Sequence, residues 1–207
     1  LRLIEEYGIM PYDSYNAHNI NYQSMMKRLV MLSNSSRNMS ELKNRAERLF
    51  DDRIGALPKK VYMLGAEYTP LEFAHSVCMR GEYLAMTSFT HHSFGEAFVL
   101  EVPDNYSNEL YYNVPIDVMM KRIERSLRAG HPVCWEGDTS ETGFDFKRGV
   151  AELTKQRPYT QKERQIEFEN HHTTDDHCMV LIGIAHDENG KRYYIAKNSW
   201  GTGNAYN

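Results

Sequence analysis

The sequence predicts an α+β fold, in which a mostly helical first half precedes an antiparallel β half. Apolar residues in the first half recur largely at helical spacing, between residues that begin or end helices. Near the C-terminus, two apolar runs flank a polar turn ending in Asn189-Gly190, which is typical of a β-hairpin. We therefore expect one domain over residues 1–207, with a helical segment at 1–110 and a β half at 111–207.

The first helices are indicated by their end signals. Gly8 and the proline that follows end a helix that begins the chain. Residues 23–33 have helical spacing, and Ser40 can cap the next helix, which closes at Gly55.

Later helices begin at clearer signals. Thr69 to Glu72 and Thr160 to Glu163 both have the capping-box pattern, and a proline stands at the first helical position of the earlier one. Residues 115–128 form an amphipathic helix, and residues 131–135 read as a strand.

The C-terminal hairpin predicts a cluster of polar side chains at its open end. A turn centred between Glu188 and Asn189 places His177 opposite Trp200. Asn198 is then the diagonal neighbour on the same face, roughly 7 Å away at Cβ, which an imidazole can reach. A His, an Asn and a covering Trp in one place suggest a catalytic site.

Composition excludes several classes of protein. The apolar fraction of 41% allows a packed core, but no apolar stretch is long enough to span a membrane. A net charge of −4 gives no electrostatic footprint for nucleic acid. No motif indicates a cofactor.

The cysteines favour a reducing compartment. Cys78, Cys134 and Cys178 are odd in number and lack the spacing of a disulfide framework. This favours the cytoplasm, although a chain that starts within a domain leaves export open. Since Cys178 alternates with His177 along a strand, we expect it to pack in the core.

Several segments resemble one peptidase family. Asp176-His177 before a strand, followed by Asn198-Ser199-Trp200-Gly201, resembles the C-terminal half of papain-like cysteine peptidases. Residues 68–73, residues 112–117, and Gly130-His131-Pro132-Val133 leading into Gly137-Asp138 resemble the bleomycin hydrolase (aminopeptidase C) branch. The resemblance implies a papain-like fold from about residue 60 onward, with a family-type insertion in the helical segment.

The resemblance also implies a role for each residue of the trio. His177 would be the general base of a cysteine peptidase, which activates the thiol, and later the general acid. Asn198 would orient the imidazole, and Trp200 would shield their hydrogen bond from water. Peptides are then the expected substrates, and aminopeptidase activity is the expected form.

Three neighbouring residues are candidates for supporting this site. Asp176 precedes the imidazole in sequence, and Gly137 and Asp138 enter the active-site side of the barrel in the family. A purely structural loop role for Asp138 remains an open alternative.

The family's nucleophile is missing from this sequence. In the family, a cysteine followed by Trp and an oxyanion glutamine lie well over a hundred residues before the histidine. Cys134-Trp135 has the same two residues as the family's Cys-Trp pair, but it lies in the predicted strand at 131–135. We therefore expect a fragment that is inactive alone, with a preceding segment or a separate chain supplying the thiol. A homo-oligomer is an expectation from the resemblance only.

Two other functions remain open. A papain-like domain without its nucleophile could serve as an inactive peptide-binding module. A metal-dependent hydrolase could use the cluster His171-His172-Thr173-Thr174-Asp175-Asp176-His177, but its adjacent pairs lack the ligand spacing of a zinc site. No metal site is therefore predicted, and His91-His92 is expected to be a solvated loop pair.

Overall fold

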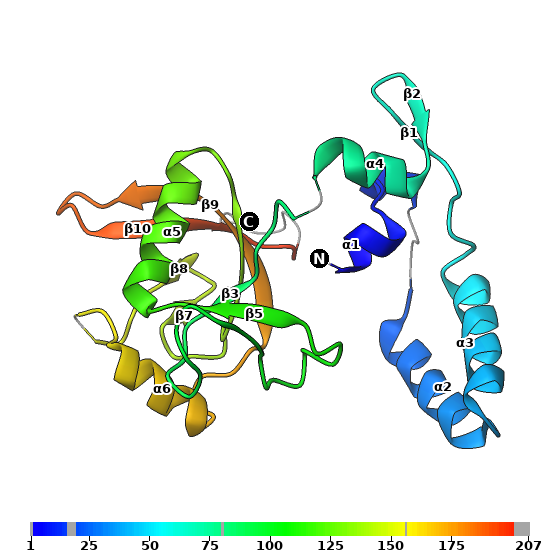
Figure 1. The fold of residues 1–207 in the computed structure, drawn as a ribbon, viewed down its shortest axis with the longest axis horizontal. Helices are drawn as coiled ribbons and strands as arrows, with labels where there is room; N and C mark the ends of the chain where they lie inside the picture. The colour runs from blue at the N-terminus through cyan, green and yellow to red at the C-terminus, as the bar shows by residue number, and fades with distance from the viewer. Residues whose placement is uncertain (1, 16–19, 80, 156, 201–207) are drawn as a thin grey trace. The chain divides into compact units, whose positions relative to one another are not determined.

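The computed structural model describes residues 2–15, 20–79, 81–155 and 157–200, and Gly201 of the Asn-Ser-Trp-Gly segment lies outside these ranges. The chain forms two compact units, Leu1–Tyr83 and Leu84–Asn207. Figure 1 colours them from blue to cyan and from green to red. The division does not fall near residue 110, because the strands after Leu84 pair with residues 110–113.

The first unit is mostly helical. Its elements, in chain order, are α1 (Arg2–Tyr7), a 3-10 turn (Tyr12–Ser14), α2 (Tyr22–Ser35), α3 (Met39–Arg53), β1 (Val61–Met63), β2 (Ala66–Tyr68) and α4 (Pro70–Val77).

Helix ends in this unit follow the predicted signals with one exception. The capping box of Thr69 and Glu72 opens α4 as expected. The cap of α3 is Asn38, whose side chain accepts a hydrogen bond from the Glu41 amide at 2.9 Å. Ser40 was therefore the wrong cap, because an asparagine two residues earlier lets the helix begin sooner.

The second unit carries the predicted hairpin. Its elements, in chain order, are β3 (Met86–Thr87), β4 (Ala97–Val99), β5 (Leu110–Asn113), α5 (Ile116–Arg128), β6 (Val133–Gly137), β7 (Phe144–Asp145), β8 (Val150–Ala151), α6 (Gln161–Glu169), β9 (His177–His186) and β10 (Arg192–Lys197). They form a three-stranded antiparallel sheet in the order β10-β9-β6, a mixed sheet in the order β3-β5-β4, and the hairpin β7-β8.

Helix α5 covers one face of the β10-β9-β6 sheet. Its buried Ile123 and Leu127 pack against Leu181 of β9 (Figure 1). Met179 is also buried, so the odd-numbered residues in the first half of β9 face the core, whereas Ile184 in the second half packs against the same core. Cys178 is exposed on the other face, and the prediction that it packs in the core was wrong because β6-β9 is covered by α5 on one side only.

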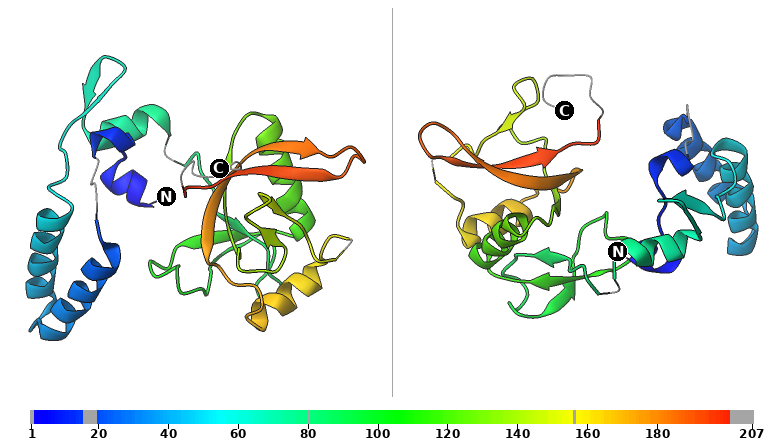
Figure 2. Two further views of the ribbon diagram at one scale, coloured as in Figure 1. Left: turned by 180° about the vertical axis from the view of Figure 1, so that it is seen from behind. Right: turned by 90° about the horizontal axis from the view of Figure 1, so that it is seen from above.

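A bulge sets the register of the hairpin. Near the turn, Ile195 pairs with Gly183, which centres the turn on Asn189. The next residue, Ala196, pairs with Leu181, so one residue of β9 is skipped. The predicted register, centred between Glu188 and Asn189, therefore holds only for the pairs on the far side of the bulge from the turn. The candidate site lies on that side. Figure 2 shows that β9, in orange, curves along its length.

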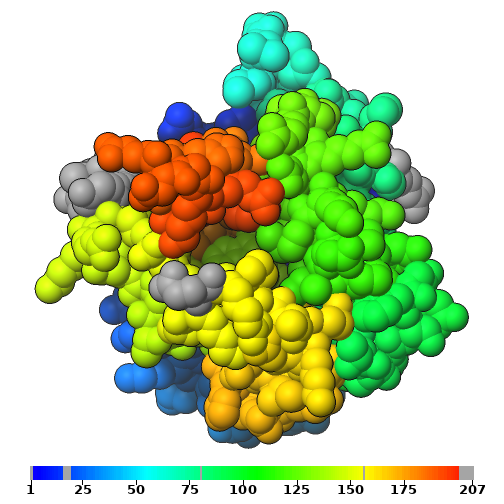
Figure 3. Space-filling model, turned by 90° about the vertical axis from the view of Figure 1, so that its left-hand side faces the viewer, coloured from blue at the N-terminus to red at the C-terminus, as the bar shows by residue number. Residues whose placement is uncertain are grey.

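The hairpin is also attached to the loop that precedes α6. Glu152 accepts hydrogen bonds from Lys191 Nζ at 2.6 Å and from the Tyr193 hydroxyl at 2.9 Å. Figure 3 shows a hollow in the surface between the hairpin, in orange to red, and the yellow segment that leads to α6. No helix among the described residues is long and apolar enough to cross a membrane.

Candidate active site

The predicted His–Asn pair is formed at the open end of the β9–β10 hairpin. His177 begins β9 and Asn198 follows the last residue of β10. Nε2 of His177 lies 2.9 Å from Oδ1 of Asn198, and both side chains are partly buried. The expectation that folding brings these two side chains into contact is confirmed.

The hydrogen bonds of Asn198 assign the tautomer of His177. Its Oδ1 also accepts the backbone N–H of Ser199 at 2.8 Å, so this atom is the amide oxygen. A carbonyl oxygen cannot donate, and Nε2 of His177 must therefore carry the hydrogen. Nδ1 is then the basic nitrogen of the neutral ring, and no hydrogen bond reaches it from the part of the chain that the structure describes.

Aromatic rings extend from His177 toward β7. The Trp200 ring stacks on the imidazole, with centroids 4.7 Å apart and an interplanar angle of 29°. The Phe146 ring contacts the indole, with centroids 4.8 Å apart, and the centroid of Phe144 lies 5.8 Å from that of Phe146. Trp200 covers one face of the imidazole and is itself 56% exposed.

Phe146 was not predicted as part of the site from the sequence. The alternation Phe144-Asp145-Phe146 places two aromatic rings on one side of an extended segment, and this was the available signal. It is weak, because β7 itself is only two residues long.

Gly137 and Asp176 hold the start of β9. Gly137 is the pairing partner of His177, and its carbonyl accepts the Asp176 N–H at 3.2 Å. The Asp176 carboxylate accepts the backbone N–H and the hydroxyl of Thr139 at 2.8 and 3.1 Å. A Cβ on Gly137 would lie 2.4 Å from the Trp135 ring, so a larger residue would displace the indole.

Asp138 is the best-satisfied carboxylate near the site. One of its oxygens accepts the backbone N–H and hydroxyl of Ser140, and the other accepts the same two groups of Thr174. Burial favours a raised pKa for this carboxyl, but these hydrogen bonds outweigh it and hold the pKa below its usual range. Asp138 thus joins the end of β6 to the segment that leads into His177.

Asp175 has the opposite electrostatic environment. Burial and the nearby carboxylates of Glu136, Asp104 and Asp176 raise its pKa to about 6. The surface beside His177 therefore carries negative charge that can be partly neutralised by protonation.

The residues of the rival metal cluster at 171–177 have other partners in the structure. His172 Nδ1 contacts Glu167, Asp176 bonds Thr139, and His177 bonds Asn198. In the described ranges, three possible ligands converge only at His91, His92 and Glu101.

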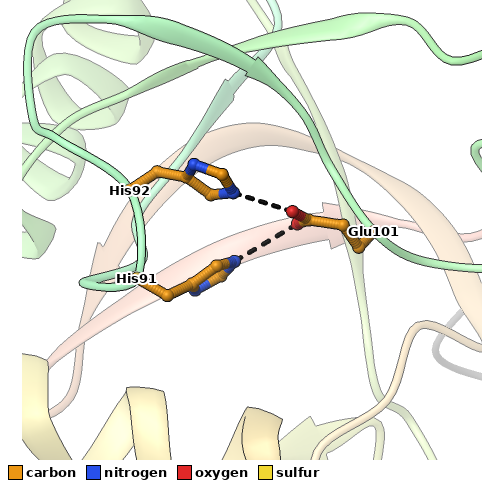
Figure 4. A group of neighbouring side chains, drawn as sticks. All are labelled: His91, His92 and Glu101. Carbon is orange, nitrogen blue, oxygen red and sulfur yellow. Dashed lines mark hydrogen bonds and ion pairs between the residues drawn. The ribbon is translucent and has the colours of Figure 1, made fainter.

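Figure 4 shows Nε2 of His91 and His92 directed at the two oxygens of Glu101, at 3.2 and 2.7 Å. The two histidines lie in a loop and are partly exposed, as expected, and both are hydrogen-bonded to Glu101.

A neighbouring glutamine explains why this group suits hydrogen bonding better than a metal. Oε1 of Gln165 accepts the Thr90 N–H, so its amide NH₂ faces Nδ1 of His91 at 2.9 Å. Nδ1 must then accept, and Nε2 carries a hydrogen toward Glu101. A metal on Nε2 would require that hydrogen to move to Nδ1, opposite another donor.

Together, the α+β architecture and a strand-end imidazole held by an asparagine carbonyl define a papain-like fold. Comparison with known proteins agrees with this class. The model of the Peptidase C1-like family matches residues 57–206. Aminopeptidase E of Lactobacillus helveticus is 26% identical over 155 residues, which are 69% of this chain and 35% of that protein.

The fold is also similar to that of a solved structure. PepW from Lactobacillus rhamnosis HN001 superposes with a TM-score of 0.58 at 16% identity, over 96% of this chain and 54% of that one. The chain therefore spans about half of this structure and about a third of the curated relative. The chain belongs to the Peptidase C1-like family, in the papain-like branch that includes the aminopeptidase C enzymes.

Proposed function

We propose that this protein is a cysteine-type peptidase in which His177 is the general base and general acid and Asn198 orients it. The observation that carries the proposal is the hydrogen bond between Nε2 of His177 and Asn198 Oδ1. It leaves Nδ1 as the nitrogen that can take a proton from a thiol, while the indole of Trp200 excludes water from one side of the pair.

The reaction would proceed through a covalent acyl-enzyme. Nδ1 of His177 takes the proton of a cysteine thiol, and the resulting thiolate attacks the carbonyl carbon of the peptide bond. The imidazolium then gives that proton to the leaving amine. In the second half, His177 takes a proton from water, which attacks the thioester carbon. The C–S bond breaks, the acid product leaves, and the thiolate and imidazolium are restored.

The nucleophile of this proposal is a cysteine outside these 207 residues. Cys134 and Cys178 are exposed on the face of the β6-β9 sheet opposite α5, whereas His177 alternates to the other face. Cys78 follows α4 in the first unit, and the residues around it do not resemble those around the family's nucleophile. The oxyanion glutamine of the family is likewise assigned to a segment outside the chain.

Peptides are the proposed substrates, and release of N-terminal residues is the proposed preference. The name of the L. helveticus relative, Aminopeptidase E, supports this preference. We also propose that identical chains assemble into an oligomer, and this part of the proposal rests on the family resemblance alone.

The test compares two histidines of the same strand in the complete protein. His177→Ala should lower kcat on a fluorogenic aminoacyl amide by about 10² to 10⁴-fold, which is the usual contribution of a general acid–base group. His186→Ala, at the exposed far end of β9, is the matched control and should retain kcat. Equal activity of the two variants would reject the assignment. Peptide binding without turnover in the unmodified protein would instead support the inactive binding module.

A further inference from the structure

The face of the β6-β9 sheet that α5 leaves uncovered carries two thiols. Cys134 pairs with Val180, and Glu136 pairs with Cys178, so the two cysteines are diagonal neighbours on one face. Their sulfur atoms lie 3.3 Å apart, and both residues are exposed.

This separation is small enough for a covalent bond. A disulfide requires sulfurs at about 2.0 Å, so the two must approach by only about 1.3 Å. Diagonal positions on neighbouring strands stand farther apart than the Cβ atoms of an ordinary disulfide, so closing this gap takes a local movement of the strands as well as side-chain rotation. We propose that Cys134 and Cys178 form a redox-responsive dithiol, which a hydroperoxide converts into an intrachain disulfide beside His177.

The charges around the pair favour a neutral product. Burial, the hydrogen bond with Cys134, and the carboxylates of Glu136 and Asp175 raise the pKa of Cys178 to about 12. The same surroundings disfavour a negatively charged sulfur at Cys178, including a sulfinate, but a disulfide carries no charge. Oxidation at this pair should therefore end at the disulfide.

The chemical step is balanced by the peroxide. The Cys134 thiolate attacks one peroxide oxygen, the O–O bond breaks, and the departing hydroxide takes up the thiol proton to leave as water. The Cys178 sulfur then attacks the resulting sulfenic sulfur; the S–S bond forms, the S–O bond breaks, and a second water leaves with the Cys178 proton. The two thiols together lose two electrons and two protons, and hydrogen peroxide takes up both and is reduced to two waters.

The bond would join the two strands that position the candidate base. Cys178 directly follows His177 in β9, and His177 pairs with Gly137 of β6. The cross-link closes a loop between residues 44 positions apart in sequence. Its formation can be measured whether or not the protein is a peptidase, so failure of the proposed function would leave this inference standing.

Peptide mapping of the complete protein tests the proposal. The reduced protein is treated with hydrogen peroxide, free thiols are alkylated with iodoacetamide, and the digest is analysed by mass spectrometry. We expect one pair of peptides joined through Cys134 and Cys178, lighter by two hydrogen atoms and separated again by dithiothreitol. Unchanged alkylation of both cysteines, or linkage of either to another partner, would overturn the proposal.

Matched variants separate the pair from general thiol oxidation. Cys134→Ser and Cys178→Ser should each abolish the link, whereas Cys78→Ser should retain it, because that thiol bonds the Ala74 carbonyl at 3.1 Å instead of a second sulfur. Phenylarsine oxide, which bridges two close thiols, should bind the unmodified protein and Cys78→Ser but neither of the other variants. Failure of the unmodified protein to retain the arsenical would contradict the sulfur geometry.

Discussion

Asn198 fixes which nitrogen of His177 can act as a base. Its amide oxygen is identified by the Ser199 N–H, and this in turn places the imidazole hydrogen on Nε2. The orientation therefore depends on a backbone group that substitution of a side chain cannot remove.

Replacing Asn198 tests this orienting role. Asn198→Ala should reduce kcat on an aminoacyl amide, but by less than His177→Ala, because the base remains and only its orientation is lost. Ser199→Ala keeps the backbone N–H and should behave like the unmodified protein. Steady-state kinetics that rank Ser199→Ala with Asn198→Ala would contradict the orienting role.

Asp175 should make stability depend on pH near neutrality. Its folded pKa of about 6 exceeds the ordinary value of 3.8, so the folded state favours the protonated form. This contribution is full below about pH 4 and is lost as the pH rises through 6. Asp175→Asn imitates the neutral form, and we expect it to gain about 1 kcal/mol at pH 7, after allowance for solvent screening, and almost nothing at pH 4.

Thermal melts over this pH range measure the effect. Glu136→Gln should also stabilise the protein at pH 7, because it removes one of the charges that raises the pKa of Asp175. A constant difference between Asp175→Asn and the unmodified protein from pH 4 to pH 7 would show that this carboxyl has an ordinary pKa.

Among single residues, His177, Asn198 and Trp200 could be predicted to lie together, because strand alternation and a short turn fix their relative positions. Phe146 could not, since its contact with Trp200 depends on how a short hairpin folds back onto the sheet. Cys178 shows the same limit: alternation assigned it to the face opposite His177, but only the packing of α5 decides which face is buried.

At the scale of elements, one carboxylate joins the end of β6 to the segment before β9. Asp138→Asn should destabilise the protein by about 2 kcal/mol at pH 7, since it replaces a buried charged acceptor of four hydrogen bonds. The folded pKa of Asp138 is lowered, so its contribution is present above about pH 4 and is lost as the pH falls further.

Chemical denaturation at two pH values checks this prediction. The gap between Asp138→Asn and the unmodified protein should be widest at pH 7 and should narrow below pH 4. Asp117→Asn, on the exposed first turn of α5, is the control and should have a small effect. A gap that widens on acidification would be inconsistent with the lowered pKa.

A second buried side chain organises the loop between β3 and β4. Asn113 is fully buried, and its amide bonds the backbone of Phe89, His92 and Ser93. Asn113→Ala should cost about 3 kcal/mol, because it leaves several buried backbone groups without partners. Asn170→Ala, at the exposed end of α6, should change the free energy of unfolding by less than about 0.5 kcal/mol. Equal stability of the two variants in urea unfolding would show that the Asn113 network is not needed.

The elements with strong local signals could be predicted, and those formed by distant pairing could not. The capping boxes at Thr69 and Thr160 are contained within four residues, and both open helices as expected. The strand β3 is two residues long and forms only by pairing with the distant β5, so no periodicity indicates it. The strand β7 is equally short and shows no period either, although its partner β8 is close in sequence. The bulge beside Ile195 is likewise invisible in the apolar pattern.

For the whole molecule, the family and fold could be inferred from sequence because the Asn-Ser-Trp and Tyr-Asn-Val-Pro-Ile-Asp segments occur together and in order. The division into units could not, since it depends on β3 and β4 pairing with β5 across the expected boundary. The face of β6-β9 on which Cys134 and Cys178 lie is also a property of the assembled sheet.

The central proposal for the whole molecule is that His177 and Asn198 serve a thiol from outside these residues. Intact-mass analysis of the complete protein, with and without an epoxide inhibitor of papain-type peptidases, tests this claim most directly. We predict a single adduct on a cysteine other than Cys78, Cys134 and Cys178, which His177→Ala prevents or greatly slows. An adduct mapped to Cys134, or no adduct at all, would contradict it.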